Sequence, residues 1–289
     1  MEAATPTLPT IPVTVIRSNS SWLNLEWRSL VAYRDLLWLL VQRDFTSKYK
    51  QTILGPIWFF LNPLITTAVF TLVFARVIGV STDGVPPMLF YLCGMLGWTY
   101  FSNVLTATSN ALVGNAGLFS KVYFPRLIPP LAVTLSNLLS LGIQLITFVG
   151  FYVYYLNAEG STLPRPNVTW LLFPVLILHM AALGLGIGLI LSALTAKYRD
   201  LQHVQAFIVN IWMYLTPIIY PLSRFPEKWQ WFAAINPMTS IVEAMRLMFL
   251  GGGSFVLPAY LLSVGMSALF LLVGLLIYQR AARTFVDIV

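Results

Sequence analysis

Histidine, cysteine and carboxylate side chains carry most catalysis and metal binding, and this sequence keeps them apart. The two histidines, His179 and His203, lie in different apolar stretches, and neither belongs to an HExxH pattern. Cys93 is the only cysteine, which excludes an intrachain disulfide and a CxxC site. The sequence therefore predicts no catalytic site and no metal site. The sparse carboxylates likewise form no cluster: Asp35, Asp44, Asp200 and Glu243.

A phosphate-binding loop is also missing from the sequence. Such a loop needs the pattern GxxxxGK followed by Ser or Thr, whose backbone amides and lysine hold the phosphates. The glycine run 251–253 is followed by Ser254 and contains no lysine. If ATP drives this protein, hydrolysis requires a separate ATPase chain. ATP and Mg would then be cofactors of that partner, and we expect no cofactor on this chain.

Neutral polar residues recur at helical spacing inside the apolar stretches. None is a paired charge, which argues against a proton or ion relay. Amide and hydroxyl groups beside aromatic rings suit a neutral polar cargo, or simply hydrogen bonds between helices. Four such stripes occur: Phe59, Asn62, Thr66 and Phe70; Thr99, Ser102, Asn103, Thr106, Ser109 and Asn110; Asn137, Ser140, Gln144 and Thr147; and His203, Phe207, Asn210, Tyr214 and Pro217.

A ridge of small residues predicts packing instead of transport. It consists of Gly184, Gly188 and Ser192, with Gly186 beside it. Small residues four positions apart let two helices approach closely. We therefore expect this ridge to contact neighbouring helices.

The distribution of charge defines the elements that position these residues. With 58% hydrophobic and 9% charged residues, the chain lies far from the roughly 25% charge of a soluble domain. Each charge-free window exceeds the roughly 20 residues that a helix needs to cross the bilayer core, where no water satisfies the backbone. The sequence thus predicts an all-α integral membrane protein with six transmembrane helices. The windows are 51–75, 84–120, 127–158, 166–196, 201–223 and 247–279.

The formal net charge of +7 is spread unevenly between the two ends of these windows. Twelve Lys and Arg residues lie on one side and five on the other. The positive-inside rule places both termini in the cytoplasm, which is consistent with an even number of spans. This distribution indicates a membrane protein and argues against a nucleic-acid partner.

Three shorter segments lie between or before the predicted spans. Segment 30–51 has apolar residues at helical spacing and predicts an amphipathic helix in the cytoplasmic interface, or an elbow that only orients the first span. Segment 114–126 is short and aromatic, which favours either a docking surface for a soluble partner or an interfacial loop. Segment 229–242 has fourteen uncharged residues interrupted by Asn236-Pro237 and predicts short re-entrant or interfacial helices on the outer side.

Several motifs together resemble the type-2 ABC exporter permeases. The run Lys48-Tyr49-Lys50-Gln51-Thr52-Ile53-Leu54-Gly55-Pro56-Ile57-Trp58, followed by Asn62-Pro63, is similar to the start of that family's first span. The similarity is greatest to the branch that exports lipid-linked polysaccharides such as O-antigen, teichoic acid and capsule. Further similar pieces are Tyr33-Arg34-Asp35-Leu36-Leu37, Lys121-Val122-Tyr123-Phe124-Pro125-Arg126, Tyr198-Arg199-Asp200-Leu201 and Pro217-Ile218-Ile219-Tyr220-Pro221.

The resemblance implies a homodimeric permease in the bacterial inner membrane, which works with two copies of a separate ATPase subunit. Six spans per chain would surround a channel at the dimer axis, through which a lipid-linked glycan passes. One departure is Lys50, where the family often has arginine; lysine keeps the charge but loses the two-pronged phosphate geometry. The implied divisions are a flexible cytoplasmic N-terminus (1–29), the interface helix (30–51), the transmembrane domain (52–283) and a cytoplasmic tail (284–289).

The resemblance and the stripes together assign roles to individual residues. The predicted channel lining is Trp58, Phe59, Asn62, Thr66, Phe70, Phe207, Asn210, Tyr214 and Tyr220. The predicted ATPase-coupling residues are Tyr33, Arg34, Asp35, Phe119, Lys121, Tyr123, Phe124 and Arg126. The predicted contacts to the lipid-linked headgroup are Arg43, Lys48, Lys50, Leu54 and Gly55. The predicted periplasmic gate is Trp229, Trp231, Asn236 and Pro237.

Other functions compete with polysaccharide export. A type-2 ABC exporter of a small drug or lipid would use the same dimer with a more apolar pathway. A membrane-embedded enzyme of glycan assembly needs acid, base or metal groups that this sequence does not cluster. A secondary transporter is disfavoured because no carboxylate inside a span offers ion coupling.

Overall fold

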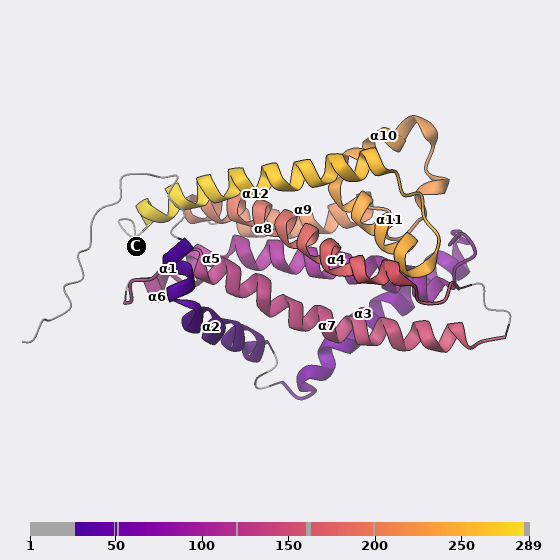
Figure 1. Ribbon diagram of the computed structural model, residues 1–289, viewed down its shortest axis with the longest axis horizontal. Coiled ribbons are helices and arrows are strands. Elements are labelled where there is room, and N and C mark those ends of the chain that lie inside the picture. The colour runs from indigo at the N-terminus through magenta and orange to yellow at the C-terminus, as the bar shows by residue number, and fades with distance from the viewer. Residues whose placement is uncertain are drawn as a thin grey trace, which may run out of the picture.

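The computed structural model describes residues 27–285 apart from 49, 51, 120, 160–162 and 199, and this part of the chain is helical without strands (Figure 1). The predicted tails at 1–29 and 284–289 lie almost entirely outside the described residues. The α-helices are α1 (Trp27–Ala32), α2 (Arg34–Ser47), α3 (Trp58–Phe70), α4 (Pro87–Ser109), α5 (Ala111–Gly114), α6 (Ala116–Phe119), α7 (Ile128–Leu156), α8 (Phe173–Lys197), α9 (Leu201–Leu215), α10 (Glu227–Ile235), α11 (Pro237–Leu250) and α12 (Leu257–Phe285). A π-helical segment, Thr71–Val77, extends α3, and 3-10 turns cover Gly55–Ile57, Val168–Leu172 and Leu222–Arg224.

Among the described residues, five helical segments are long and apolar enough to cross a membrane, whereas the sequence predicts six. The exception is the window 201–223, which forms the 15-residue helix α9 and then turns, because Thr216 takes extended backbone before Pro217. At 1.5 Å per residue such a helix covers about 22 Å, less than the roughly 30 Å hydrocarbon core. The five segments are Trp58–Val77, Pro87–Ser109, Ile128–Leu156, Val168–Lys197 and Leu257–Arg283.

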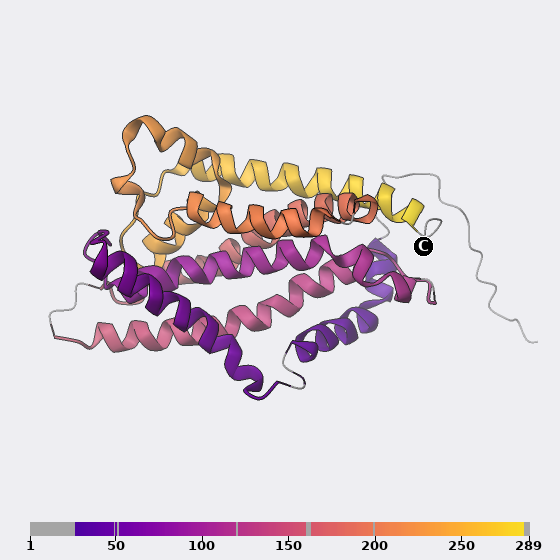
Figure 2. The ribbon, with the colours of Figure 1, turned by 180° about the vertical axis from the view of Figure 1, so that it is seen from behind.

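Helix α4 lies at the centre of the bundle. Of its most apolar window, 78% is buried, and α3, α7, α8 and α11 pack around it. The corresponding buried shares are 11% for the α3 segment and 17% for α12, so these two helices lie at the periphery. Figure 2 shows α3 and α9 on the same face of the bundle.

The predicted ridge of small residues is confirmed as a packing surface. A Cβ atom added to Gly188 would lie 2.9 Å from Leu105 O of α4, and one added to Gly186 would lie 2.5 Å from Leu271 N of α12. Ser192 Oγ accepts a hydrogen bond from Leu112 N at 3.4 Å. Helix α8 therefore contacts α4 on one side and α12 on the other at nearly backbone distance.

The predicted interface helix over 30–51 differs from the structure in extent. The chain breaks at Tyr33, whose φ of −96° and ψ of 21° separate α1 from α2, and α2 ends at Ser47. Leu40 and Val41 are buried against Phe124, Ile128 and neighbouring residues of the loop before α7. Trp38 and Leu39 on the other side are 58% and 59% exposed, so the exposed side of α2 is not uniformly polar.

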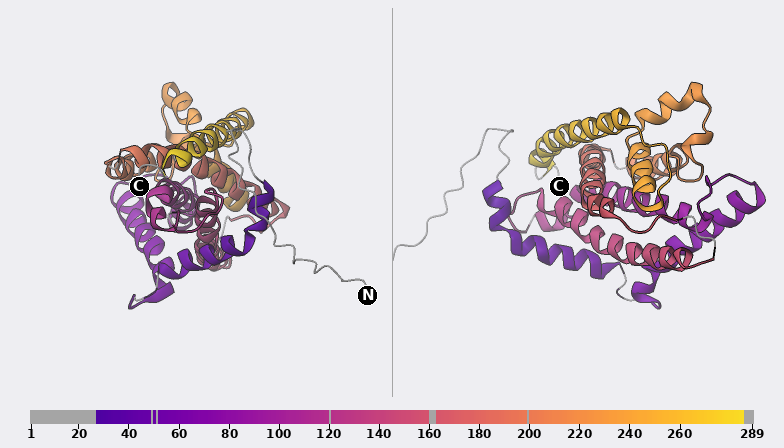
Figure 3. Two further views of the ribbon diagram at one scale, coloured as in Figure 1. Left: turned by 90° about the vertical axis from the view of Figure 1, so that its left-hand side faces the viewer. Right: turned by 45° about the vertical axis from the view of Figure 1, so that its right-hand side comes forward.

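The two ends of the bundle carry different elements. Helices α1, α2, α5 and α6 lie at the same end as the last turns of α12, and α10 and α11 lie at the opposite end (Figure 1). Pro237 separates α10 from α11, as the sequence predicts for a break at this residue. Figure 3 shows α10 standing away from the other helices.

Candidate functional site

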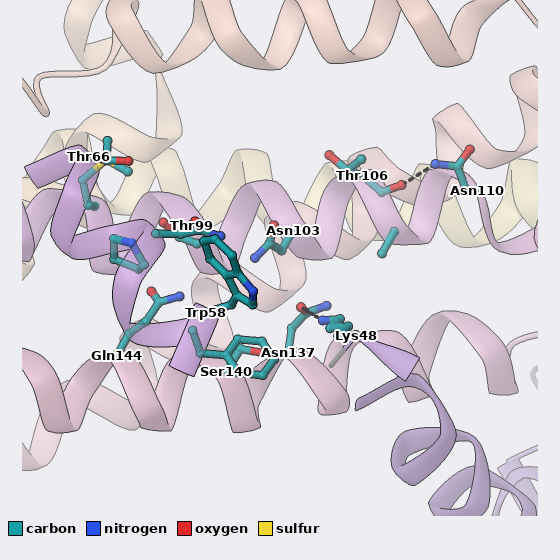
Figure 4. A pocket seen from close by; sticks show the side chains of 15 residues that line it. Lys48, Trp58, Thr66, Thr99, Asn103, Thr106, Asn110, Asn137, Ser140 and Gln144 are labelled. Carbon is teal, nitrogen blue, oxygen red and sulfur yellow. Dashed lines mark hydrogen bonds between the residues drawn. The ribbon is translucent and has the colours of Figure 1, made fainter. Parts of the chain in front are cut away.

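A polar groove of about 490 Å³ lies between α3, α4 and α7. It collects side chains from three of the four predicted polar stripes, and Figure 4 shows them around the space between the helices. Nine of its fifteen lining residues carry amide or hydroxyl groups, which can hydrogen-bond to a ligand rich in hydroxyls. The lining residues are Lys48, Trp58, Phe59, Asn62, Pro63, Thr66, Met95, Thr99, Asn103, Thr106, Ala107, Asn110, Asn137, Ser140 and Gln144.

Helix α4 supplies one wall of the groove. Thr99, Asn103, Thr106 and Asn110 recur at spacings of four and three, which places them on one helical face. Asn110 Nδ2 donates a hydrogen bond to Thr106 O at 3.0 Å and so holds its amide against the helix (Figure 4). Ser109 of the same predicted stripe is buried instead, and its carbonyl accepts a hydrogen bond from a residue of α8.

Helix α7 supplies the opposite wall with Asn137, Ser140 and Gln144. Ser140 and Gln144 are 3% and 8% exposed. Among the described residues, Ser140 Oγ and Gln144 Oε1 have no hydrogen-bond partner. Both oxygens can therefore accept a hydrogen bond from a polar group that enters the groove.

Lys48 is the only Lys or Arg among the residues that line the groove. Its Nζ donates a hydrogen bond to Asn137 Oδ1 at 2.7 Å (Figure 4). Burial of the amine lowers the pKa of Lys48 from its usual 10.5, and the nearby charge of Asp44 partly opposes this shift. A cation with a neutral partner at one end of a polar groove is suited to an anionic group such as a phosphate.

The first predicted stripe is divided by the structure. Trp58, Phe59, Asn62 and Thr66 of α3 line the groove. Phe70 does not: it is 8% exposed and packs edge-on against Tyr91 of α4. The stripe therefore turns into the hydrophobic core at its far end, because α3 tilts towards α4 there.

The fourth stripe lies away from the groove. Phe207 and Tyr214 are 66% and 55% exposed on α9, and Asn210 between them is exposed as well. Tyr220 stacks on Phe225 with ring centroids 5.7 Å apart. The predicted channel lining is therefore divided: four residues line the groove, three lie on the open face of α9, Tyr220 lies in the segment after α9 and Phe70 lies in the core.

The predicted ATPase-coupling residues gather where α2 meets the loop before α7. Tyr33 Oη donates a hydrogen bond to Tyr123 O at 3.3 Å, and the rings of Phe119 and Phe124 stack 5.3 Å apart. Phe124 is 4% exposed whereas Tyr123 is 74% exposed, so the first supports the fold and the second faces outward. The remaining four are placed as follows: Arg34 and Asp35 form an exposed ion pair, Lys121 is exposed, and Arg126 O accepts a hydrogen bond from Tyr278 Oη.

Of the five predicted headgroup contacts, only Lys48 lines the groove. Arg43 is bonded to Asp44 Oδ1 at 2.7 Å and to Asn115 Oδ1 at 3.2 Å. Lys50 and Leu54 are exposed, and Gly55 has a φ of +52°, which a residue with a side chain rarely adopts. The structure thus concentrates the cationic character of the groove in a single residue.

The predicted gate residues divide into Asn236 and Pro237, where α11 begins, and two exposed tryptophans on α10. Asn236 Oδ1 accepts hydrogen bonds from Trp212 Nε1 at 3.0 Å and from Met238 N at 3.1 Å. Pro237 follows at the first position of α11, where its fixed φ suits a helix start. On α10, Trp229 and Trp231 are 50% and 59% exposed.

Two buried polar clusters escape the sequence reasoning. Glu243 and Arg246 form an ion pair at the end of the bundle that carries α10 and α11, although the sequence presents them only as charges that flank an apolar segment. His179 Nε2 lies 3.0 Å from Ser267 Oγ and 3.2 Å from Ser263 Oγ, which joins α8 to α12. The spacing of three between Glu243 and Arg246 is a signal that could have identified the first cluster.

The amino-acid sequence matches a known family of membrane proteins. Residues 35–250 match the family model described as "ABC-2 type transporter", and the chain belongs to this family. The resemblance to type-2 ABC exporter permeases is therefore confirmed.

Particular relatives are permeases of surface polysaccharide export. The chain is 32% identical to the O-antigen export system permease protein RfbA of Myxococcus xanthus, over 77% of this chain and 83% of that protein. It is 28% identical to a protein of the same name from Klebsiella pneumoniae, over 88% and 95%. It is 23% identical to the polysialic acid transport protein KpsM of Escherichia coli, over 85% and 91%.

Proposed function

We propose that this chain is the transmembrane permease subunit of an ATP-driven exporter that moves a lipid-linked polysaccharide out of the cytoplasm. The groove between α3, α4 and α7 carries the proposal, because it joins a hydroxyl- and amide-rich wall to a single cation. Moving a hydroxyl into hydrocarbon without a partner costs about 4–8 kcal/mol, so a glycan needs such a wall along its whole path. The names of the relatives, which specify O-antigen and polysialic acid, support the same cargo class.

The proposed exporter is a homodimer. Helices α3 and α9 lie on one face, and both are weakly covered within the chain (Figure 2). A second copy placed against this face would bring the groove of one chain and the α9 stripe of the other to a common axis. The exposed Phe207 and Tyr214 would then complete the wall that the groove begins. In this arrangement α9 with residues 216–223 acts as the fifth of six spans, and α10 and α11 are re-entrant helices at the periplasmic exit.

The proposed ATPase partner docks at the end that carries α2 and the loop before α7. Tyr123 and Lys121 are exposed there, next to the buried cluster of Leu40, Val41 and Phe124. Movement of the partner would pass through this cluster to α7, which forms a wall of the groove. Both termini lie in the cytoplasm in this arrangement, and the partner holds ATP and Mg.

Lys48 is the proposed contact for the phosphate of the lipid carrier. Its hydrogen bond to Asn137 fixes the amine at the groove, where a phosphate oxygen would accept from it. Reading the groove as the site of a small apolar drug is less supported, because ten of its fifteen lining residues have polar side chains. An enzyme of glycan assembly is also less supported, because no acidic residue lines the groove.

Reconstitution with the partner tests the proposal. The permease is copurified with the ATPase encoded beside it and placed in liposomes with or without lipid-linked glycan. We expect stable association and faster ATP hydrolysis when glycan is present. Failure of the two chains to associate would exclude the ABC exporter, and stimulation by apolar drugs but not by glycan would favour the small-molecule alternative.

A further inference from the structure

A buried ion pair lies at the outer end of the bundle, remote from Lys48. Arg246 Nη1 is 2.8 Å from Glu243 Oε1, and the two side chains are 2% and 3% exposed. They stand one turn apart on α11. Ionisable groups in a membrane protein interior are costly and usually serve a purpose other than stability.

Both members of the pair also hold the backbone of other segments. Arg246 Nη2 donates a hydrogen bond at 3.0 Å to Ile218 O, in the turn that follows α9. Ser254 N donates one at 2.6 Å to Glu243 Oε2, in the segment that leads into α12. The Arg246 guanidinium lies 3.8 Å from the centre of the Phe90 ring on α4. Four segments therefore meet at two side chains.

Gly253 makes the contact to Glu243 possible. Its φ is +117°, and a Cβ atom at this position would lie 3.0 Å from Glu243 Oε2. A side chain there would therefore push the chain away from the carboxylate and break the hydrogen bond from Ser254. The loop 251–254 is shaped to receive the ion pair.

Helix α10 has no comparable anchor. Among the described residues, its side chains make one hydrogen bond, from Gln230 Nε2 to Phe225 O at 3.3 Å, which stays within the same segment. The two flanks of the helix are held: Ser223 Oγ donates to Asp83 Oδ2 at 2.7 Å, and Asn236 Nδ2 donates to Thr216 Oγ1 at 2.9 Å. A cavity of about 250 Å³ lies between α10, α11 and the start of α12.

We propose that Glu243 and Arg246 are positioning residues for export. The pair fixes the outer ends of α9, α11 and α12 on α4, so that movement at the exit is confined to α10, between its two held flanks. The inference rests on the proposed function, since only transport requires the outer end to open. The charged pair holds two backbone groups by hydrogen bonds, Ile218 C=O and Ser254 N–H. Apolar residues cannot form these hydrogen bonds.

A paired apolar substitution separates positioning from stability. A buried ion pair replaced by apolar residues of similar volume often leaves stability unchanged or higher. We therefore expect Glu243→Leu/Arg246→Met to insert, to copurify with the ATPase, to melt at a higher temperature than either single variant and to keep the basal ATP hydrolysis of the parent, yet to lose glycan export. Each single substitution should also lower the melting temperature, because it leaves one buried charge without its partner. Arg224→Met, at an exposed residue of the same end, is the control and should export normally.

The outcomes decide between the two claims. Normal export by the stable double variant would overturn the positioning role and leave the proposed function intact. A melting temperature of the double variant as low as that of the single variants would assign the pair to stability and overturn it as well. Absence of export by the parent complex would instead contradict the proposed function.

Discussion

Lys48 Nζ donates a hydrogen bond to Asn137 Oδ1 across 2.7 Å, and this contact joins the end of α2 to the wall of the groove on α7. The carboxylate nearest to it in the sequence, Asp44, lies 2.7 Å from Arg43 instead. The amine therefore has a neutral partner that an anionic ligand can supplement without breaking an ion pair.

Removing the amine should weaken substrate binding. A hydrogen bond to a charged group contributes about 1.5–3 kcal/mol, so Lys48→Met should reduce the affinity for a lipid-linked diphosphate about ten- to a hundred-fold. Lys50→Met, two residues away and outside the groove lining, is the matched control and should bind as the parent does. Binding of a fluorescent lipid-linked glycan to the reconstituted complex measures both, and equal losses in the two variants would contradict the assignment of Lys48.

Binding at this site should depend on pH. Because burial lowers the pKa of Lys48 below 10.5, the amine loses its proton at a lower pH in the folded protein than in the unfolded chain. Affinity for an anion should fall as the pH rises through this lowered value, whereas the contribution of the group to folding stability rises between that value and 10.5. Titration of glycan binding from neutral to alkaline pH should show the decline in the parent and not in Lys48→Met.

Replacing Gln144 with an apolar residue should preserve stability and slow transport. Its Oε1 is buried without a hydrogen-bond partner among the described residues, and such a group costs about 1–3 kcal/mol. Gln144→Leu should therefore raise or preserve the melting temperature while it slows export. Gln144→Glu, which keeps the size but adds charge, should lower both. A faster or unchanged export rate in Gln144→Leu would show that the amide does not contact the cargo.

The contact between α8 and α12 should tolerate no added methyl group. A Cβ atom on Gly186 would lie 2.5 Å from Leu271 N, and overpacking of this kind costs about 1–3 kcal/mol. Gly186→Ala should lower the melting temperature in detergent, whereas Gly142→Ala, where nothing lies within 4 Å, should be neutral or stabilising. Similar melting temperatures for the two variants would contradict the close approach.

Neighbouring aromatic residues before α7 should behave differently when truncated. Tyr123 is 74% exposed, so Tyr123→Ala should leave the permease stable and reduce its association with the ATPase. Phe124 is 4% exposed in the cluster with Leu40 and Val41, so Phe124→Ala should cost about 3–5 kcal/mol of stability. Thermal unfolding of the permease alone and pull-down with the ATPase distinguish the two effects. Full association by Tyr123→Ala would move the docking surface elsewhere.

Most of the helical architecture could be predicted because the bilayer imposes it. Charge-free windows locate five long helices, and the break at Pro237 follows from the chemistry of proline. The fifth window, 201–223, contains only the 15-residue helix α9, because freedom from charge does not separate a helix from the turn that follows it: Thr216 and Pro217 are as uncharged as α9 itself.

The sequence predicts which residues of each helix share a face, but not which of these faces come together to form the groove. Periodicity places Asn62, Asn103 and Asn137 each on one face of its own helix, and the structure brings all three to one groove. Periodicity contains no information about which helices are neighbours, so it also groups Phe70 and Tyr214 with the lining, although neither reaches the groove. The Glu243–Arg246 pair could not be predicted for a related reason. Charged residues beside an apolar segment give the same sequence pattern whether their side chains face water or each other.

The glycine contact between α8 and α12 also sets the pattern of variation expected among homologous exporters. A Cβ atom on Gly274 would overlap with the carbonyl oxygen of Gly186, so enlarging either residue requires the two helices to separate along their length. Substitutions at these two positions should therefore occur together, accompanied by substitutions elsewhere in the contact between α8 and α12. Leu272, which is 62% exposed on the same helix, should instead drift freely among apolar residues. Among homologous exporters, residues along the contact between α8 and α12 should therefore vary together.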